Sequence, residues 1–415
     1  MIRKLLGPVL AAAAALSVGV GPLPPYFDAR ATGKEPVIKS QGREGNCWAV
    51  SASSGLEAML MPKEHLIFSA DHIVNRNGFI FDTDEGGDYR MIMAYLASRS
   101  GPVAESDDPY GDGESPDGLD AAVYVKEMRL FEDADEESVK DALLRWGPVQ
   151  TSLCMDRRMT ASSADYYNEE TRAFYCPSQK KVTHDILILG WDDEFPAENF
   201  KLPPSGDGAW ICQNTWGEKF GDGGIFYVSY EDPNIARKFL AYCRAEKPDG
   251  EILCQTDPLG WIGRIGYDKD TCWFANVYTA PVDGRLTSFG FYSVGADTEY
   301  ELYFAPASGG SFDPGDLKEC GSGKLDDAGY YTLQPDDVIR LDEGQEFAVA
   351  VRICTKGEKK PVAVEIDKDE TTADVTLAGK NSYISSTGEK WEQTQKAFGA
   401  NVCLKAGITP EDGME

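Results

Sequence analysis

Histidine is scarce in this chain, because its 415 residues include only His65, His72 and His184. A reaction that needs an imidazole base therefore has few candidates. Basic residues are also outnumbered, with 40 Lys and Arg against 69 Asp and Glu, which gives a formal charge of -29 at pH 7. This charge repels phosphate backbones and anionic lipid headgroups, so nucleic acid is not expected as a partner.

Long uncharged stretches are missing after the N-terminus. The one such stretch covers residues 5–20 and follows Arg3 and Lys4, a pattern typical of a secretory signal. At roughly 16 residues it is shorter than the ~20 that a spanning helix needs. We therefore expect residues 1–21 to be a signal peptide, with a short N-terminal anchor as the alternative. The protein is predicted to be secreted, or associated with the cell surface, and to contact a membrane only if this segment is retained.

Closely spaced cysteine pairs are missing as well. The chain has ten cysteines, which suits an oxidising compartment, but none of them form the CxxC spacing typical of zinc sites. No metal site and no cofactor are predicted. If one cysteine stays free to react, an odd number remains, so at least one more thiol should be unpaired.

The length of the chain exceeds the usual size of one core, so we expect two domains. Residues 22–250 mix helical and extended patterns, with helices predicted at 47–61, at 89–99 and from 133, and strands at 182–189, 209–213 and 225–230. Beyond residue 254 apolar residues alternate with a period of two, as at 347–353. This pattern predicts an all-β sandwich over residues 255–406, followed by a polar tail at 407–415.

Cys47 and His184 are the best candidates for chemistry. His184 begins a predicted strand that would hold its ring rigidly, whereas His65 and His72 have charged or polar neighbours and are predicted to be surface or turn residues. Cys47 lies where a loop containing Gly and Asn leads into a helix. The helix dipole and a nearby imidazolium would lower the pKa of its thiol below ~8.5. A buried, unreactive cysteine is the alternative reading of this residue alone.

Four segments together resemble the papain-like cysteine peptidases. Residues 41–49 (QGREGNCWA) resemble the nucleophile segment, and residues 182–185 (VTHD) with the Gly-Trp at 190–191 resemble the histidine strand. Residues 213–217 (QNTWG) resemble the Asn-Ser-Trp-Gly element, and residues 84–87 (DEGG) are similar to the Gly-Gly loop of the substrate cleft. The order Cys, His, Asn is also that of the family.

The resemblance implies an α+β papain-like catalytic domain with a helical lobe and a β-barrel-like lobe. It implies that Cys47 is the nucleophile and His184 the general base, and that Asn214 orients the imidazole. Gln41 would supply an oxyanion-hole donor together with the Cys47 backbone N–H. The implied substrate-binding residues are Gly86, Gly87, Thr183 and Trp216, and Trp216 would also shield the His184–Asn214 hydrogen bond.

One departure from the family lies next to the nucleophile. The family often has a cysteine three residues before the nucleophile, but this chain has Glu44 there. The usual disulfide that anchors this loop is therefore not expected, and the loop is predicted to be more mobile.

The C-terminal part resembles a lectin-like β-sandwich that follows papain-like domains in some secreted bacterial peptidases. Residues 257–261 (DPLGW) and 273–278 (WFANVY) carry this resemblance. Its aromatic residues could stack on glycans, although core packing is the commoner use of such residues. A platform that braces the catalytic domain is an equal alternative.

The sequence therefore predicts a secreted cysteine endopeptidase that acts on protein or peptide substrates through a thioester on Cys47. Two alternatives stay open. One is a Cys-His amidase of peptidoglycan stem peptides, which uses the same nucleophile chemistry. The other is a catalytically inactive adhesion or carbohydrate-binding protein built on a peptidase scaffold.

Overall fold

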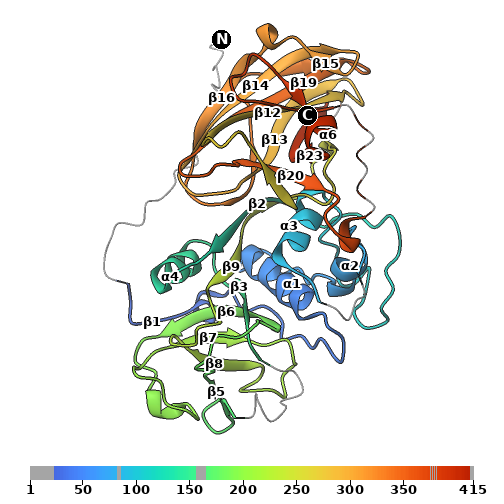
Figure 1. Ribbon diagram of the computed structural model, residues 1–415. Coiled ribbons are helices and arrows are strands. Elements are labelled where there is room, and N and C mark those ends of the chain that lie inside the picture. Colours follow the sequence, from blue (N-terminus) through green and yellow to red (C-terminus); the bar gives the residue numbers. More distant parts are fainter. Residues whose placement is uncertain are drawn as a thin grey trace, which may run out of the picture.

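The computed structural model describes residues 23–81, 86–155, 165–373, 375, 377, 379 and 381–411, which form an N-terminal and a C-terminal part in contact with each other (Figure 1). The predicted signal peptide or anchor at 1–21 lies outside the described residues, as do residues 84 and 85 of the Gly-Gly loop. None of the helices in the described ranges combines the length and apolarity needed to cross a membrane.

Helix α1 (Cys47–Leu60) runs through the core of the N-terminal part, beside α2 (Ala70–Asn75) and α3 (Tyr89–Ala97). Its Ala- and Ser-rich sequence suits this position, because small side chains let every residue from 48 to 58 be buried. At Gly55 a Cβ would lie 2.6 Å from the ring of Tyr242, so the helix needs glycine there. The contact lets α1 pack closely on the sheet behind it.

Helix α4 (Glu136–Arg145) packs on the same sheet and was predicted to begin at Asp133. It begins later because Asp135 is its N-cap, with a carboxylate that accepts a hydrogen bond from the Ser138 N–H. Two glutamates in its first turn complement the helix dipole.

An antiparallel sheet forms the other half of the N-terminal part, in the order β2–β9–β3–β6–β7–β8. Short strand β5 runs parallel to β8 and pairs with β4, while β1 pairs with the end of β6. The bounds are β1 Tyr26–Asp28, β2 Tyr124–Glu132, β3 Val149–Leu153, β4 Tyr167–Asn168, β5 Ala173–Phe174, β6 His184–Asp192, β7 Ala209–Gln213, β8 Ile225–Ser229 and β9 Lys238–Glu246, with short 3-10 helices at Ala29–Thr32 and Ala197–Asn199.

The C-terminal part consists of two β-sheets packed around one apolar core, which confirms the predicted sandwich (Figure 1). Large side chains such as Phe274, Phe291 and Val349 fill this core. The elements are β10 Ile252–Cys254, β11 Gly263–Ile265, β12 Thr271–Thr279, β13 Gly284–Ser293, β14 Thr298–Ser308, β15 Ser311–Phe312, β16 Lys318–Leu325, β17 Gly329–Leu333, β18 Ile339–Leu341, β19 Glu346–Thr355, β20 Val362–Ile366, β21 Ser382–Ser385, β22 Glu392–Gln393, α6 Thr394–Phe398, β23 Ala400–Val402 and β24 Leu404–Pro410, with 3-10 helices at Pro314–Asp316 and Glu370–Thr372.

The polar tail predicted at 407–415 begins too early. Strand β24 continues to Pro410, and Ile408 is fully buried between the sheets. In this segment the alternation of apolar and polar residues is too short to distinguish a strand from a polar tail by sequence alone. Residues 412–415 lie outside the described residues.

The two parts share one hydrogen-bonded sheet. Strand β17 of the C-terminal part pairs with β2 of the N-terminal part, with Gly329 opposite Arg129 and Tyr331 opposite Glu127. Gly329 is needed at this crossing, because a Cβ there would lie 2.0 Å from the Met128 carbonyl oxygen. The main chain therefore fixes how the two parts sit relative to each other.

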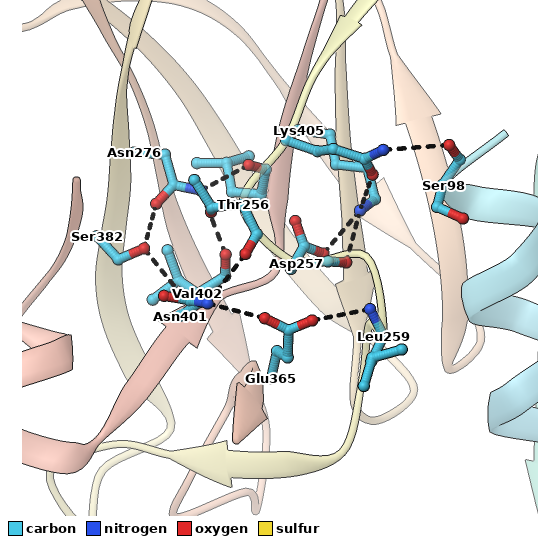
Figure 2. Close-up of polar contacts among 12 residues, drawn as sticks. Ser98, Thr256, Asp257, Leu259, Asn276, Glu365, Ser382, Asn401, Val402 and Lys405 are labelled. Carbon is cyan, nitrogen blue, oxygen red and sulfur yellow. Dashed lines mark hydrogen bonds and ion pairs between the residues drawn. The ribbon is translucent and has the colours of Figure 1, made fainter. Parts of the chain in front are cut away.

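A buried polar cluster lies where the linker enters the sandwich (Figure 2). The Lys405 ammonium contacts the Asp257 carboxylate at 2.8 Å and donates to the Gln255 side chain at 2.9 Å. Gln255 in turn donates to the carbonyl of Ser98 at the end of α3, which links the cluster to the N-terminal part. The carboxylate of Glu365 accepts hydrogen bonds from Asn401 and from the Leu259 N–H.

A second buried cluster crosses the boundary at Glu251. Its carboxylate forms ion pairs with Arg99, just after α3, and with Lys126 of β2 at 2.8 Å. It also accepts hydrogen bonds from Thr287 and Ser288 of β13. Burial raises the pKa of Glu251, but the two cations outweigh burial and hold that pKa at about 2.

We expect Glu251→Gln to lower the free energy of unfolding by about 3–5 kcal/mol, because it leaves two buried cations without their shared counterion. The matched control is Glu299→Gln, whose partner Lys324 is exposed, and it should cost less than about 1 kcal/mol. Since the pKa of Glu251 is depressed, its contribution should be complete above about pH 4.3 and lost as pH falls through 2. Chemical denaturation at pH 7 measures the free energy of unfolding of both variants. Equal losses in Glu251→Gln and Glu299→Gln would contradict this expectation.

Candidate active site

Cys47 is the first residue of α1, at the positive end of the helix dipole. The preceding residue, Asn46, is buried, and its carbonyl accepts hydrogen bonds from the Ala49 and Val50 N–H groups at 3.0 Å. Its side-chain amide donates to the Tyr110 hydroxyl. The start of the helix is therefore held by both the main chain and the side chain of Asn46.

His184 begins β6 and is buried, with only 3% of its surface exposed. Its Nε2 lies 2.7 Å from Asn214 Oδ1, and the amide oxygen can only accept, so Nε2 carries the proton in this contact. The Trp216 ring stacks on the imidazole with centroids 4.7 Å apart. This arrangement leaves Nδ1 as the nitrogen that can take a proton.

The loop before Cys47 has no disulfide but is held by side-chain hydrogen bonds. Gln41 is 2% exposed; its side-chain oxygen accepts from the Thr215 hydroxyl at 2.5 Å, and its amide nitrogen donates to the Glu44 carbonyl at 2.7 Å. Tyr110 donates to the Gln41 carbonyl. These contacts give a physical reason against the predicted mobility, because they fasten both ends of the 41–44 turn.

One cavity of about 1200 Å³ brings most of the predicted site residues together. Its lining includes Gln41, Cys47, Gly86, Gly87, Thr183 and His184. Asn214 and Trp216 are not among the residues that line it; they lie against the His184 ring. At Gly87 a Cβ would lie 2.5 Å from the Trp48 ring, so this wall of the cavity requires glycine.

The environment of the Cys47 thiol differs from the sequence expectation of a low pKa. Burial, and then the negative charge of Asp185, raise the pKa of this thiol to about 12, while backbone N–H groups of Asp185, Trp48 and Cys47 itself lower it. The helix terminus alone is thus too weak to ionise the sulfur. A thiolate at neutral pH requires a nearby proton acceptor that supplies a compensating positive charge, and His184 lines the same cavity.

A buried polar network beneath the site was missed by the sequence analysis. The Asp185 carboxylate accepts hydrogen bonds from Ser152 at 2.6 Å and Gln150 at 2.8 Å, and burial raises its pKa to about 6. Gln150 also donates to the Trp48 carbonyl in α1 and accepts from Tyr242. These residues come from three strands, β3, β6 and β9, so no local motif could have indicated that they meet.

The other candidate residues lie away from this cavity. His72 was predicted to be a surface or turn residue, but it is 3% exposed within α2 and its Nδ1 lies 2.8 Å from the Tyr95 hydroxyl. His65 is exposed, as predicted. All ten cysteines, each of which falls within the described ranges, are unpaired. No group of His, Cys, Asp and Glu side chains that could hold a metal occurs in the described part of the chain.

Two family models cover most of the chain. The model of the papain family cysteine protease matches residues 23–242, and that of the lectin like domain matches residues 253–407. Because the first match covers more than half of the 415 residues, the chain belongs to the papain family of cysteine proteases. The predicted family and fold are confirmed.

Individual proteins support this assignment. Cathepsin S of Bos taurus is 27% identical over 220 residues, which are 51% of this chain and 62% of cathepsin S, so the chain spans about three fifths of that relative. Two structures of the clostridial cysteine protease Cwp84 share its fold. The structure after propeptide cleavage has a TM-score of 0.83 and 24% identity, and covers 93% of this chain and 99% of its own. The structure of the Clostridium difficile protease and lectin-like domains has a TM-score of 0.81 and 23% identity, and covers 94% and 89%.

We expect His184→Ala to slow alkylation of Cys47 by iodoacetamide at pH 7 by about a hundredfold or more, because the thiol is then left with its raised pKa. Its alkylation rate should keep rising with pH well above 9. Mass mapping of the peptide that contains Cys47 separates this thiol from the other nine. His65→Ala is the matched control and should react like the wild type. A wild-type rate in His184→Ala would contradict the dependence of the thiolate on this imidazole.

Proposed function

We propose that the protein is a cysteine endopeptidase that hydrolyses protein or peptide chains through an acyl-enzyme on Cys47. The observation that carries this proposal is that Gln41, Cys47 and His184 line one cavity while Asn214 holds the far side of the imidazole at 2.7 Å. Membership of the papain family over residues 23–242 supports the same reaction.

In the proposed reaction, His184 takes the proton of the Cys47 thiol, and the sulfur attacks the carbonyl carbon of the scissile peptide bond. The carbonyl oxygen becomes an oxyanion. When the tetrahedral intermediate collapses, the C–N bond breaks and the amine leaves with the proton from His184, which forms a thioester. A water molecule then gives a proton to His184 and attacks the thioester, so that the acid product and the Cys47 thiol are released.

Gln41 and the backbone N–H of Cys47 are the proposed donors to the oxyanion. The Gln41 amide nitrogen gives one hydrogen to the Glu44 carbonyl, which leaves its second hydrogen for the substrate. Because Thr215 and Glu44 hold both ends of this amide, it is already oriented before the substrate binds. Asn214 keeps the imidazole in one tautomer, and Trp216 covers their hydrogen bond. Gly86, Gly87 and Thr183 are proposed to contact the substrate.

The alternatives from the sequence are less well supported. A peptidoglycan amidase gains no support from the family match, which is to peptidases. An inactive scaffold does not need Gln41, Cys47 and His184 on one cavity with Asn214 bound to the imidazole. We also propose secretion, which the charged and apolar pattern of residues 1–21 supports. Cwp84, with the same fold, is described as surface layer associated.

The full chain should hydrolyse unfolded casein, and Cys47→Ala should abolish this activity without a change in folding. A thiol-directed epoxide should label Cys47. Cys354→Ala, a half-buried cysteine of the sandwich, is the control and should keep wild-type activity. Casein hydrolysis that survives in Cys47→Ala, or inactivation by labelling at another cysteine, would refute the proposed mechanism.

We further propose that the sandwich binds glycans on the outer face of the β14–β19–β12 sheet. Strand alternation points Phe274 and Leu302 into the core, whereas Trp273 and Tyr303 lie on the opposite face with rings 4.8 Å apart. Trp391 packs edge-on against Trp273, and all three rings are half-buried. Adjoining aromatic faces with nearby polar groups suit stacking on sugar rings.

Trp391→Ala should remove most of the signal of the protein on a glycan array, because it takes away one of the adjoining rings. Phe398→Ala on α6 is the matched control, since this exposed aromatic lies outside the cluster. The absence of any array signal from the wild-type protein would exclude this site as a glycan receptor.

A further inference from the structure

The cavity that contains Cys47 and His184 is partly walled by the C-terminal domain. Ile262, Lys368, Asp369, Thr371 and Thr372 line it together with the residues described above. All five belong to the sandwich, far from the nucleophile in sequence. With a volume of about 1200 Å³, the cavity exceeds the ~300–1,000 Å³ typical of a small-molecule site, and its size suits an extended chain.

The lining segment at 368–372 is locally rigid. It follows β20 and forms a short 3-10 helix with a capping box between Asp369 and Thr372. The Asp369 carboxylate also accepts from the Thr371 N–H at 3.0 Å. The Thr372 hydroxyl accepts from the Lys368 and Asp369 N–H groups at 2.8 and 3.1 Å. These bonds give the segment one shape without help from a substrate.

This segment is also fixed to the catalytic domain. The Ile80 N–H donates to the Thr371 carbonyl at 2.9 Å, which joins the segment to the chain just before the Gly86–Gly87 wall. Nearby, the guanidinium groups of Arg90 and Arg264 both contact the buried ring of Trp261, at 5.1 and 4.8 Å from its centroid. Because β2 and β17 also pair across the boundary, the wall cannot move away as a hinged lid without breaking main-chain hydrogen bonds.

The charge of the cavity differs from that of the whole protein. Six cationic residues line it, Arg43, Arg90, Lys181, Arg237, Lys238 and Lys368, against four anionic ones, Glu44, Asp88, Asp185 and Asp369. The chain as a whole carries a formal charge of -29. Lys368 is exposed, and like Arg43, Lys181 and Arg237 it takes part in none of the described ion pairs, whereas Arg90 and Lys238 pair with Glu132. Of these unpaired cations in the lining, Lys368 is the one that the sandwich supplies. An acidic group at this wall would therefore meet an exposed cation whose charge also acts on the adjacent Asp369 carboxylate.

We propose that the 368–372 segment of the sandwich is a substrate-binding subsite of the peptidase cleft, at which Lys368 selects an acidic side chain of an extended polypeptide, at a position remote from the scissile bond. This inference rests on the proposed peptidase function and names a substrate preference for it. The second domain then takes part in substrate selection in addition to any role in attachment.

The test uses pairs of peptides that differ only by Asp or Lys at one position, scanned from the third to the sixth residue on each side of the cleavage site. For the full chain, kcat/KM should favour Asp at one such position, and Lys368→Glu should lower the Asp-to-Lys ratio there by about tenfold. Lys356→Glu, an exposed lysine of the sandwich outside the cavity, is the matched control and should keep the wild-type ratios.

A binding measurement separates this subsite from the catalytic proposal. In the Cys47→Ala background, fluorescence anisotropy should show that Lys368→Glu weakens binding of the preferred Asp peptide by a similar factor. If the wild type cleaves none of the peptides but binding still depends on Lys368, the peptidase proposal fails and the subsite stands. If Lys368→Glu changes neither the ratios nor the binding, or no peptide binds at all, the subsite is refuted.

Discussion

Strand β2 is hydrogen-bonded along both edges, to β9 of the catalytic domain and to β17 of the lectin-like domain. Because of this double pairing, one continuous sheet connects the two domains, and their arrangement does not depend on a flexible linker. The buried Glu251 and Asp257 clusters then have a fixed geometry in which to form their ion pairs. The shape of the cleft follows, because its walls come from both domains.

The same rigidity bears on how the half-buried Cys47 thiol, whose environment raises its pKa, would react in the proposed mechanism. Burial and Asp185 oppose the thiolate, so ionisation depends on a proton acceptor with one defined orientation. Asn214 and Trp216 provide that orientation from the turn after β7, and Gln150 ties the helix that carries Cys47 to the sheet that carries His184. In the proposed mechanism, reactivity is therefore a property of the Cys47–His184 pair, whose two residues begin α1 and β6.

The local part of this arrangement was predictable. A helix at Cys47, a strand at His184 and a β-rich second half follow from periodicity and from short motifs. The failures are non-local: the burial of His72 depends on Tyr95 in another helix, and the last strand was short enough to read as a tail. The Asp185 network and the 368–372 wall join segments far apart in sequence, which no local pattern encodes.

The shared sheet also argues against regarding the sandwich as a detachable binding module. Without β17, one edge of β2 would expose unpaired N–H and C=O groups, a known route to aggregation. Loss of the sandwich would also remove Thr287 and Ser288, whose hydroxyl groups donate to Glu251. The Glu251 carboxylate would then be held less firmly between Arg99 and Lys126. The sandwich thus supplies the catalytic domain with backbone hydrogen bonds to β2 and with hydrogen bonds to the buried Glu251 carboxylate. A peptidase built this way gains cleft-lining residues from its second domain as a direct consequence of how it folds.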